Sequence, residues 1–90
     1  MVKVDSGAAR ALAHGGSLLP VGVTAVSGDF ERGDTIRVSN LQDKVIGLGL
    51  SNYSSRDLGA VMGKQSGDIE MVLGFTFGDE VIHRNNMVLL

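Results

Sequence analysis

Two patterns of hydrophobic and polar positions organise the start of the chain. In residues 2–4, valines flank a lysine, and this alternation predicts a short strand. Alanine and leucine then dominate residues 8–13, which favours a helix with its N-cap at Asp5 or Ser6. Gly15 is expected to end that helix in a left-handed conformation. The first elements are therefore a strand and a short helix.

The middle of the chain changes to a pattern rich in β-branched residues. Three runs, 23–30, 34–39 and 44–51, are separated by clusters of Gly, Asp, Asn and Gln that are typical of turns. Ile36 and Val38 alternate with polar neighbours, so one face of the second run should be buried and the other solvated. These runs predict three consecutive strands.

Two short helices are predicted in the second half. Ser54 and Asp57 have the spacing of a capping box, and Gly63 is placed to end the first helix. The second helix should start at Ser66 and stop at Gly74. The expected buried positions are Leu58, Val61 and Met62 in the first helix and Ile69, Val72 and Leu73 in the second.

The C-terminal residues favour two further strands, 80–83 and 87–90, joined through 84–86. Ninety residues cannot cover both faces of a wide open sheet. A closed or nearly closed barrel with helices at its ends leaves few strand edges unpaired. The sequence therefore predicts a single mainly β domain with short helices, spanning residues 1–90.

Composition and charge argue against nucleic-acid and membrane partners. Ten Asp and Glu against eight Lys and Arg give a formal net charge of −2, whereas nonspecific nucleic-acid binders are usually basic. The absence of cysteine excludes disulfides and thiolate metal sites and fits a cytoplasmic protein. The first ten residues lack the apolar core of a signal peptide. No apolar run approaches the ~20 residues of a membrane span, so no membrane partner is expected.

Two glycine motifs resemble nucleotide-binding loops only partly. The stretch 59–65 (GAVMGKQ) is one residue too short for a phosphate-binding loop, and Lys64 is not followed by Ser or Thr. The stretch 47–52 (GLGLSN) has Asn52 in place of the third glycine of a dinucleotide fingerprint and lies in a strand pattern. Its glycines are interpreted instead as bulges or crowded barrel corners.

No arrangement of side chains predicts catalysis or a metal site. His14 and His83 lie in different predicted elements; His14 fits a cation at a helix C-terminus and His83 a strand residue. The chain has neither a Gly-x-Ser-x-Gly elbow nor a cysteine nucleophile. Aromatic residues make up 4 % of the chain and are not interleaved with basic ones, so a mixed solvated surface is preferred over a nucleic-acid interface.

Three longer stretches carry a resemblance to a known family. They are 16–38 (GSLLPVGVTAVSGDFERGDTIRV), 52–58 (NYSSRDL) and 73–90 (LGFTFGDEVIHRNNMVLL). In this order they resemble the C-terminal PUA domain of bacterial glutamate 5-kinases, and the resemblance covers essentially the whole chain. It implies a PUA-like pseudo-barrel of five to six strands with capping helices, in agreement with the element order above.

The resemblance also implies a role within a larger enzyme. Glutamate 5-kinases transfer the ATP γ-phosphate to the side-chain carboxylate of glutamate, the first step of proline biosynthesis. ATP and Mg would bind a preceding amino-kinase domain, which is absent from this chain, so no cofactor and no catalytic residue are expected here. The chain would then be a noncatalytic accessory or regulatory domain, with that kinase domain and a second copy of itself as the expected partners.

An alternative follows from other PUA domains, in which the first helix, the glycine turn after it and a late strand contact RNA. The residues that match by position are Arg10, His14, Gly15, Gly16, Ser17, Leu18, Leu19 and Arg84. Gly16 stands where kinase-type domains often carry a longer polar or basic residue, and Asn85 where Asp is common. Leu18 and Leu19 are expected to turn into the barrel. A basic concave surface here would favour RNA, and a neutral or acidic one the accessory role.

Overall fold

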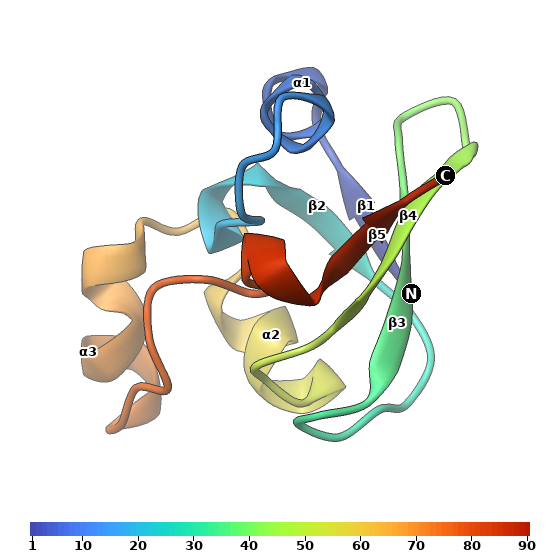
Figure 1. The fold of residues 1–90 in the computed structure, drawn as a ribbon. Coiled ribbons are helices and arrows are strands. Elements are labelled where there is room, and N and C mark those ends of the chain that lie inside the picture. Colours follow the sequence, from blue (N-terminus) through green and yellow to red (C-terminus); the bar gives the residue numbers. More distant parts are fainter.

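A five-stranded sheet is the main feature of the computed structural model, which describes residues 1–90 (Figure 1). Its strands are β1 (Val2–Val4), β2 (Val23–Val26), β3 (Thr35–Ser39), β4 (Val45–Leu50) and β5 (Met87–Leu89). Their spatial order is β2-β1-β3-β4-β5, and every neighbouring pair is antiparallel except β1 and β3, which are parallel. All five strands form within runs that the sequence predicts to be strands.

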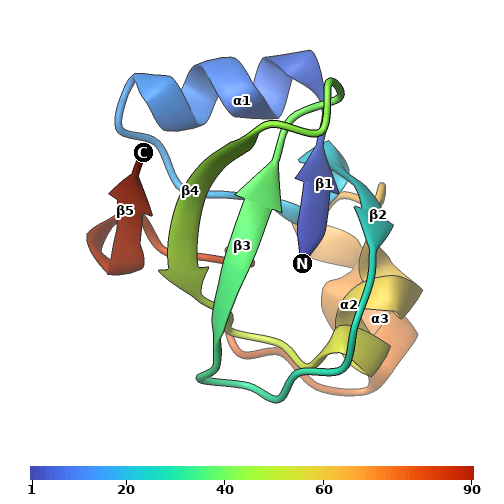
Figure 2. The same ribbon diagram turned by 90° about the vertical axis from the view of Figure 1, so that its right-hand side faces the viewer.

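Helical segments are short and lie outside the sheet. The α-helices are α1 (Ser6–Ala13), α2 (Ser55–Val61) and α3 (Ile69–Leu73), and the 3₁₀ turns are η1 (Pro20–Gly22), η2 (Ser66–Asp68) and η3 (Arg84–Asn86). Figure 2 shows α1 across the top of the curled sheet, with α2 and α3 behind β2. No helix has the length and apolar character needed to cross a bilayer.

The side of the core that the sheet leaves open is closed by two segments that pair with each other. The N–H of Leu18 donates to the carbonyl of Ile82 at 2.9 Å, and the N–H of Val81 donates to the carbonyl of Leu18 at 2.7 Å. The side chains of Leu18, Val81 and Ile82 are all buried. This pairing, together with α2, confirms the expected mainly β pseudo-barrel with short capping helices, with five strands.

The core lies between the sheet, α2 and the closing segments. It contains fourteen buried hydrophobic residues from β1, β2, β3, the three α-helices and the loops between elements, and Tyr53 is its largest fully buried side chain. The Tyr53 hydroxyl donates to the carbonyl of Gly78 at 2.6 Å and accepts from the N–H of Phe77 at 2.9 Å. A buried phenol needs such partners, so this residue also fixes the loop that leads from α3 to the closing segment.

Most helix ends follow the predicted signals, but α3 begins at Ile69 and not at Ser66, because Ser66–Asp68 forms the 3₁₀ turn η2. Ser54 is the N-cap of α2 and accepts from the N–H of Asp57 at 3.2 Å. Gly74 ends α3 with φ +82°. Gly63 also has a positive φ, but α2 has already ended one residue earlier, at the cap Met62. The local chemistry of these caps therefore decides where the short helices begin and end.

Several sequence predictions are wrong. Residues 80–83 do not form a strand: only Ile82 makes a β-bridge, with Leu18, because η3 begins two residues later and turns the chain away. Val72 and Met62 are exposed, since α3 is only five residues long and Met62 lies beyond the last turn of α2. Ser39 is buried on the face predicted to be solvated, because the register shifts between Val38 and Ser39.

Gly47 and Gly49 confirm the interpretation of crowded positions in a barrel. A Cβ built on Gly49 would lie 2.6 Å from Cγ2 of Ile82 and 3.0 Å from the carbonyl oxygen of Asn86. A Cβ on Gly47 would lie 3.1 Å from the carbonyl oxygen of Val88. These glycines let β4 approach both β5 and the closing segment.

We therefore expect Gly49→Ala to lower the free energy of unfolding by about 1–3 kcal/mol, since the added methyl group overpacks a site bounded partly by backbone. Urea denaturation followed by circular dichroism measures this change. Gly59→Ala is the matched control, because a Cβ at this position within α2 meets nothing within 4 Å. It should stabilise the domain by about 0.5–1 kcal/mol through its higher helix propensity. Equal effects of the two variants would contradict the packing argument.

Candidate functional site

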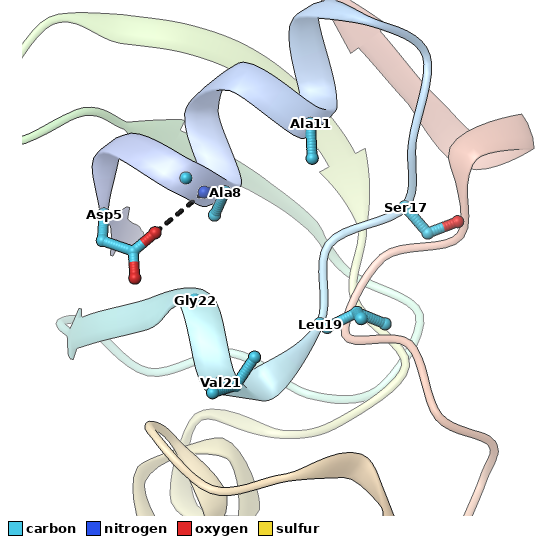
Figure 3. A pocket seen from close by; sticks show the side chains of 8 residues that line it. Asp5, Ala8, Ala11, Ser17, Leu19, Val21 and Gly22 are labelled. Atoms are coloured by element: carbon cyan, nitrogen blue, oxygen red, sulfur yellow. Dashed lines mark hydrogen bonds between the residues drawn. The ribbon is translucent and has the colours of Figure 1, made fainter.

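A cleft of about 320 Å³ lies between α1 and the segment that follows it (Figure 3). In Figure 3 the helix forms one wall and residues 19–22 form the facing wall. The lining residues are Asp5, Gly7, Ala8, Ala11, Ser17, Leu19, Val21 and Gly22. Its lining includes two of the residues that sequence reasoning selected, Ser17 and Leu19.

Both ends of α1 are fixed by local hydrogen bonds. The Asp5 carboxylate accepts from the N–H of Ala8 at 2.8 Å and so acts as the N-cap. At the other end Gly15 has φ +86°, and the N–H of Gly16 donates to the carbonyl of Ala11 at 2.8 Å. The predicted left-handed glycine is therefore confirmed, and it turns the chain back along the helix to form the second wall.

Gly22 brings the two walls into contact at the deep end of the cleft. Its carbonyl accepts from the N–H of Asp5 at 2.9 Å, and a Cβ built on it would lie 2.5 Å from the Cβ of Ala8. Only glycine allows this approach without a shift of backbone or helix. Small residues on both walls therefore set the width of the cleft.

The cleft carries almost no charge. Asp5 is its only ionisable lining residue, and that carboxylate is already occupied by the helix cap. No Lys, Arg or His lines the cleft. Leu19 and Val21 are each 41 % exposed, so apolar surface is open to a ligand. Such a surface suits apolar protein side chains better than phosphate groups, which require cationic or N–H donors.

The site residues predicted from the sequence lie in one region of the fold, but some of them are exposed and others are buried. Ser17 and Leu19 line the cleft, whereas Leu18 is only 1 % exposed and belongs to the core. Leu19 therefore does not turn into the barrel as expected, because Pro20 begins η1 directly after it and directs its side chain outward. Arg84 lies in η3, not in a strand, and its backbone N–H donates to Oγ of Ser17 at 2.8 Å.

Arg10 and His14 are exposed on α1. Nδ1 of His14 lies 2.8 Å from the carbonyl oxygen of Arg10, which places the imidazole at the C-terminal end of the helix as predicted. His83 is the N-cap of η3, so its assignment to a strand is wrong; its Nδ1 accepts from the N–H of Asn85 at 3.1 Å. No cluster of three or more His, Asp or Glu side chains has the geometry of a metal site.

Sequence reasoning missed most of the cleft wall. Ala8 and Ala11 carry no distinctive chemistry, and Val21 and Gly22 are separated from them by the whole glycine turn. The one signal for this wall in the sequence is the spacing of Gly7, Ala8 and Ala11, which places small residues on one face of the helix. A stripe of small residues predicts close approach of another segment, although it does not identify that segment.

Comparison with known proteins finds a matching family profile and a group of similar sequences. Residues 1–73 match the family profile described as PUA domain. The chain is 56 % identical over 86 residues to a glutamate 5-kinase of Paramagnetospirillum magneticum and 46 % identical over 87 residues to one of Syntrophotalea carbinolica. Each match covers 96 % of this chain and 23 % of the relative, so the chain spans about a quarter of these proteins and matches their C-terminal PUA region.

Solved structures agree on the fold. A PUA domain of Aeropyrum pernix, crystallised as a tartrate complex, superposes with a TM-score of 0.67 and 29 % identity over 91 % of this chain and 40 % of its own. The archaeal box H/ACA sRNP Nop10–Cbf5 complex contains a chain that superposes with a TM-score of 0.60 at 24 % identity over 63 % of this chain and 18 % of its own. The latter likeness concerns the fold alone.

Contact between Gly22 and Ala8 can be tested directly. Gly22→Ala should destabilise the domain by about 1–3 kcal/mol, because the new methyl group overlaps that of Ala8. Ala8→Gly alone should cost roughly 0.5–1 kcal/mol of helix propensity. The double variant should be more stable than the sum of the two changes by about 0.5–3 kcal/mol, since the clash is removed. Additive changes in urea denaturation would show that the two walls do not meet.

Proposed function

The chain belongs to the PUA domain family and matches the C-terminal region of glutamate 5-kinases, and from this we propose that it is the noncatalytic accessory domain of such a kinase. The parent enzyme would phosphorylate the side-chain carboxylate of glutamate, with ATP and Mg bound in the preceding amino-kinase domain. The present domain would support assembly or regulation of that enzyme through protein contacts. It contributes no residue to the phosphoryl transfer.

The partly apolar cleft, which has no cationic side chain, is the observation that carries this proposal. A surface that recognises RNA phosphates gains most of its affinity from Lys and Arg. The walls of this cleft supply none, and their one carboxylate would repel phosphate. Exposed Leu19 and Val21 are instead suited to bury the apolar side chains of a protein partner.

The position of the cleft also supports the kinase domain as the partner. Asp5 lies directly after β1, four residues from Met1, so the cleft is close in sequence to the point where a preceding domain would join. A contact between domains that are joined by a short connection benefits from a high effective concentration. A modest surface is then sufficient for stable docking.

Deletion of residues 1–90 from the full-length kinase tests the proposal. The remaining kinase domain should still phosphorylate glutamate, but its oligomeric state, its inhibition by proline or its metal dependence should change. Steady-state kinetics and sedimentation velocity measure these properties. Complete loss of phosphorylation in a folded kinase domain would contradict the noncatalytic role, and unchanged regulation and assembly would contradict the accessory role.

A single substitution in the full-length enzyme links this effect to the cleft. Leu19→Asp should reproduce the change caused by deletion, because a carboxylate cannot be buried in an apolar contact without a partner. Val88→Asp on β5 is the matched control, since Val88 is also exposed but lies outside the cleft. The proposal fails if both variants have the same effect.

RNA binding is the second candidate, because Arg10, His14 and Arg84 lie near the glycine turn, as in the PUA surface that contacts RNA. A structured RNA should be titrated at low and at moderate salt, with Arg10→Ala and Arg84→Ala as variants. If RNA were the ligand, binding would be strongest at low salt and each variant would weaken it. We expect no specific binding, because the cleft itself has no cationic side chain.

A further inference from the structure

A second exposed surface lies on the other side of the domain from the N-terminus. Two of the four aromatic residues of the chain, Phe75 and Phe77, are exposed there beside a cationic side chain. It consists of Arg32, Met71, Val72, Phe75 and Phe77, and we call it the aromatic patch. Met71 is 86 % exposed, and Phe75 and Phe77 are 39 % and 41 % exposed. Clustered exposed aromatic and methionine side chains are typical of protein interfaces.

The aromatic patch is held rigidly. The rings of Phe75 and Phe77 have their centroids 5.1 Å apart, and that of Phe77 lies 5.6 Å from the buried ring of Tyr53. The N–H of Phe77 is fixed by the Tyr53 hydroxyl at 2.9 Å. Because these contacts restrict the exposed rings in the free domain, less conformational entropy is lost when a partner covers them.

Arg32 adds a cation in a fixed position. Its guanidinium carbon lies 3.8 Å from the centre of the Phe77 ring. The structure contains one salt bridge, between Lys3 and Asp43, so Arg32 has no carboxylate partner. Its N–H groups are therefore free to meet an acidic group of a partner, in the bidentate manner that favours Arg at interfaces.

Acidic residues adjoin members of the aromatic patch in the sequence. Glu70 precedes the most exposed member, Met71, on α3, and Asp79 follows the phenylalanine loop. Neither carboxylate has an ion partner within the chain. A surface with one free cation and free carboxylates at its border is complementary in charge to a second copy of itself, whereas the carboxylates would repel nucleic acid.

The N-terminus emerges on the opposite side. In Figure 1 the N-terminus lies at the right and α3 at the far left; in Figure 2, seen from that right-hand side, the N-terminus is in front and α3 behind. A domain that precedes Met1 therefore joins far from the aromatic patch. This leaves the aromatic patch accessible to another molecule when the cleft is occupied.

We propose that the aromatic patch is a self-association surface, through which two copies of this chain pair about a two-fold axis. In this arrangement Phe75 and Met71 of each copy pack on those of the other, and each Arg32 meets the Glu70 carboxylate of its partner. The proposal goes beyond the accessory role, because it concerns a different surface and does not depend on the cleft. The aromatic patch contains five residues, fewer than the 20–30 that each partner usually contributes to a stable interface, so the isolated domain should dimerise weakly.

Sedimentation equilibrium of the 90-residue chain at rising concentration tests this surface. Phe75→Ser should lower the association constant by at least about tenfold, as expected for loss of a central interface anchor. Leu90→Ser is the matched control: Leu90 is also an exposed apolar residue, but it lies at the C-terminus, away from α3 (Figure 1). It should leave the association constant unchanged. Circular dichroism establishes that both variants are folded.

Charge exchange tests the two-fold arrangement. Arg32→Glu and Glu70→Arg should each abolish self-association, because like charges then face each other twice. An equimolar mixture of the two variants should associate at least as well as the unmodified chain, since each of the two contacts in the mixed dimer then joins opposite charges. Association that survives both single variants, or a mixture that stays monomeric, would overturn the proposal. A monomeric unmodified chain at millimolar concentration, or preferential binding of single-stranded RNA to the aromatic patch, would overturn it as well.

Discussion

The pairing of Leu18 with Val81 and Ile82 holds together parts of the chain that are more than sixty residues apart. The sheet alone covers one side of the core, and this pairing closes the other with three backbone hydrogen bonds and three buried side chains. The paired residues also contact the elements on either side of them. Ile82 packs where Gly49 leaves room, and the N–H of Asn52 donates to the carbonyl of Val81 at 2.8 Å.

Both exposed surfaces depend on this closure. The segment before Leu18 is the glycine turn that leads from α1 to the second wall of the cleft, and the segment before Val81 is the loop that presents Phe75 and Phe77. Each is fixed at its other end by a helix, α1 or α3. A small domain thereby orders two surfaces of different chemistry on one core: a cleft of small and aliphatic residues with no cationic side chain, and an aromatic patch with a free arginine.

Local sequence signals predicted the secondary structure better than they predicted the exposed surfaces. Caps such as Ser54 and Gly15 act within a few residues of themselves, so the ends of the helices could be predicted from the sequence. Residues 80–83 could not, because their alternation is compatible with a strand and only the start of η3 limits the pairing to Ile82. The exposure of Leu19 was missed for a similar reason, since its direction is set by the turn at Pro20. The far wall of the cleft depends on the contact between Gly22 and Ala8, which no local pattern reveals.

The identity of the partner at the cleft is best tested by nuclear magnetic resonance. The ¹⁵N-labelled 90-residue domain should be titrated separately with the unlabelled kinase domain of the parent enzyme and with structured RNA at low salt. A protein-binding accessory domain predicts that the kinase domain shifts the amide signals of Ser17, Leu19 and Val21 and that RNA leaves them in place. Shifts of these amides caused by RNA alone would contradict that role.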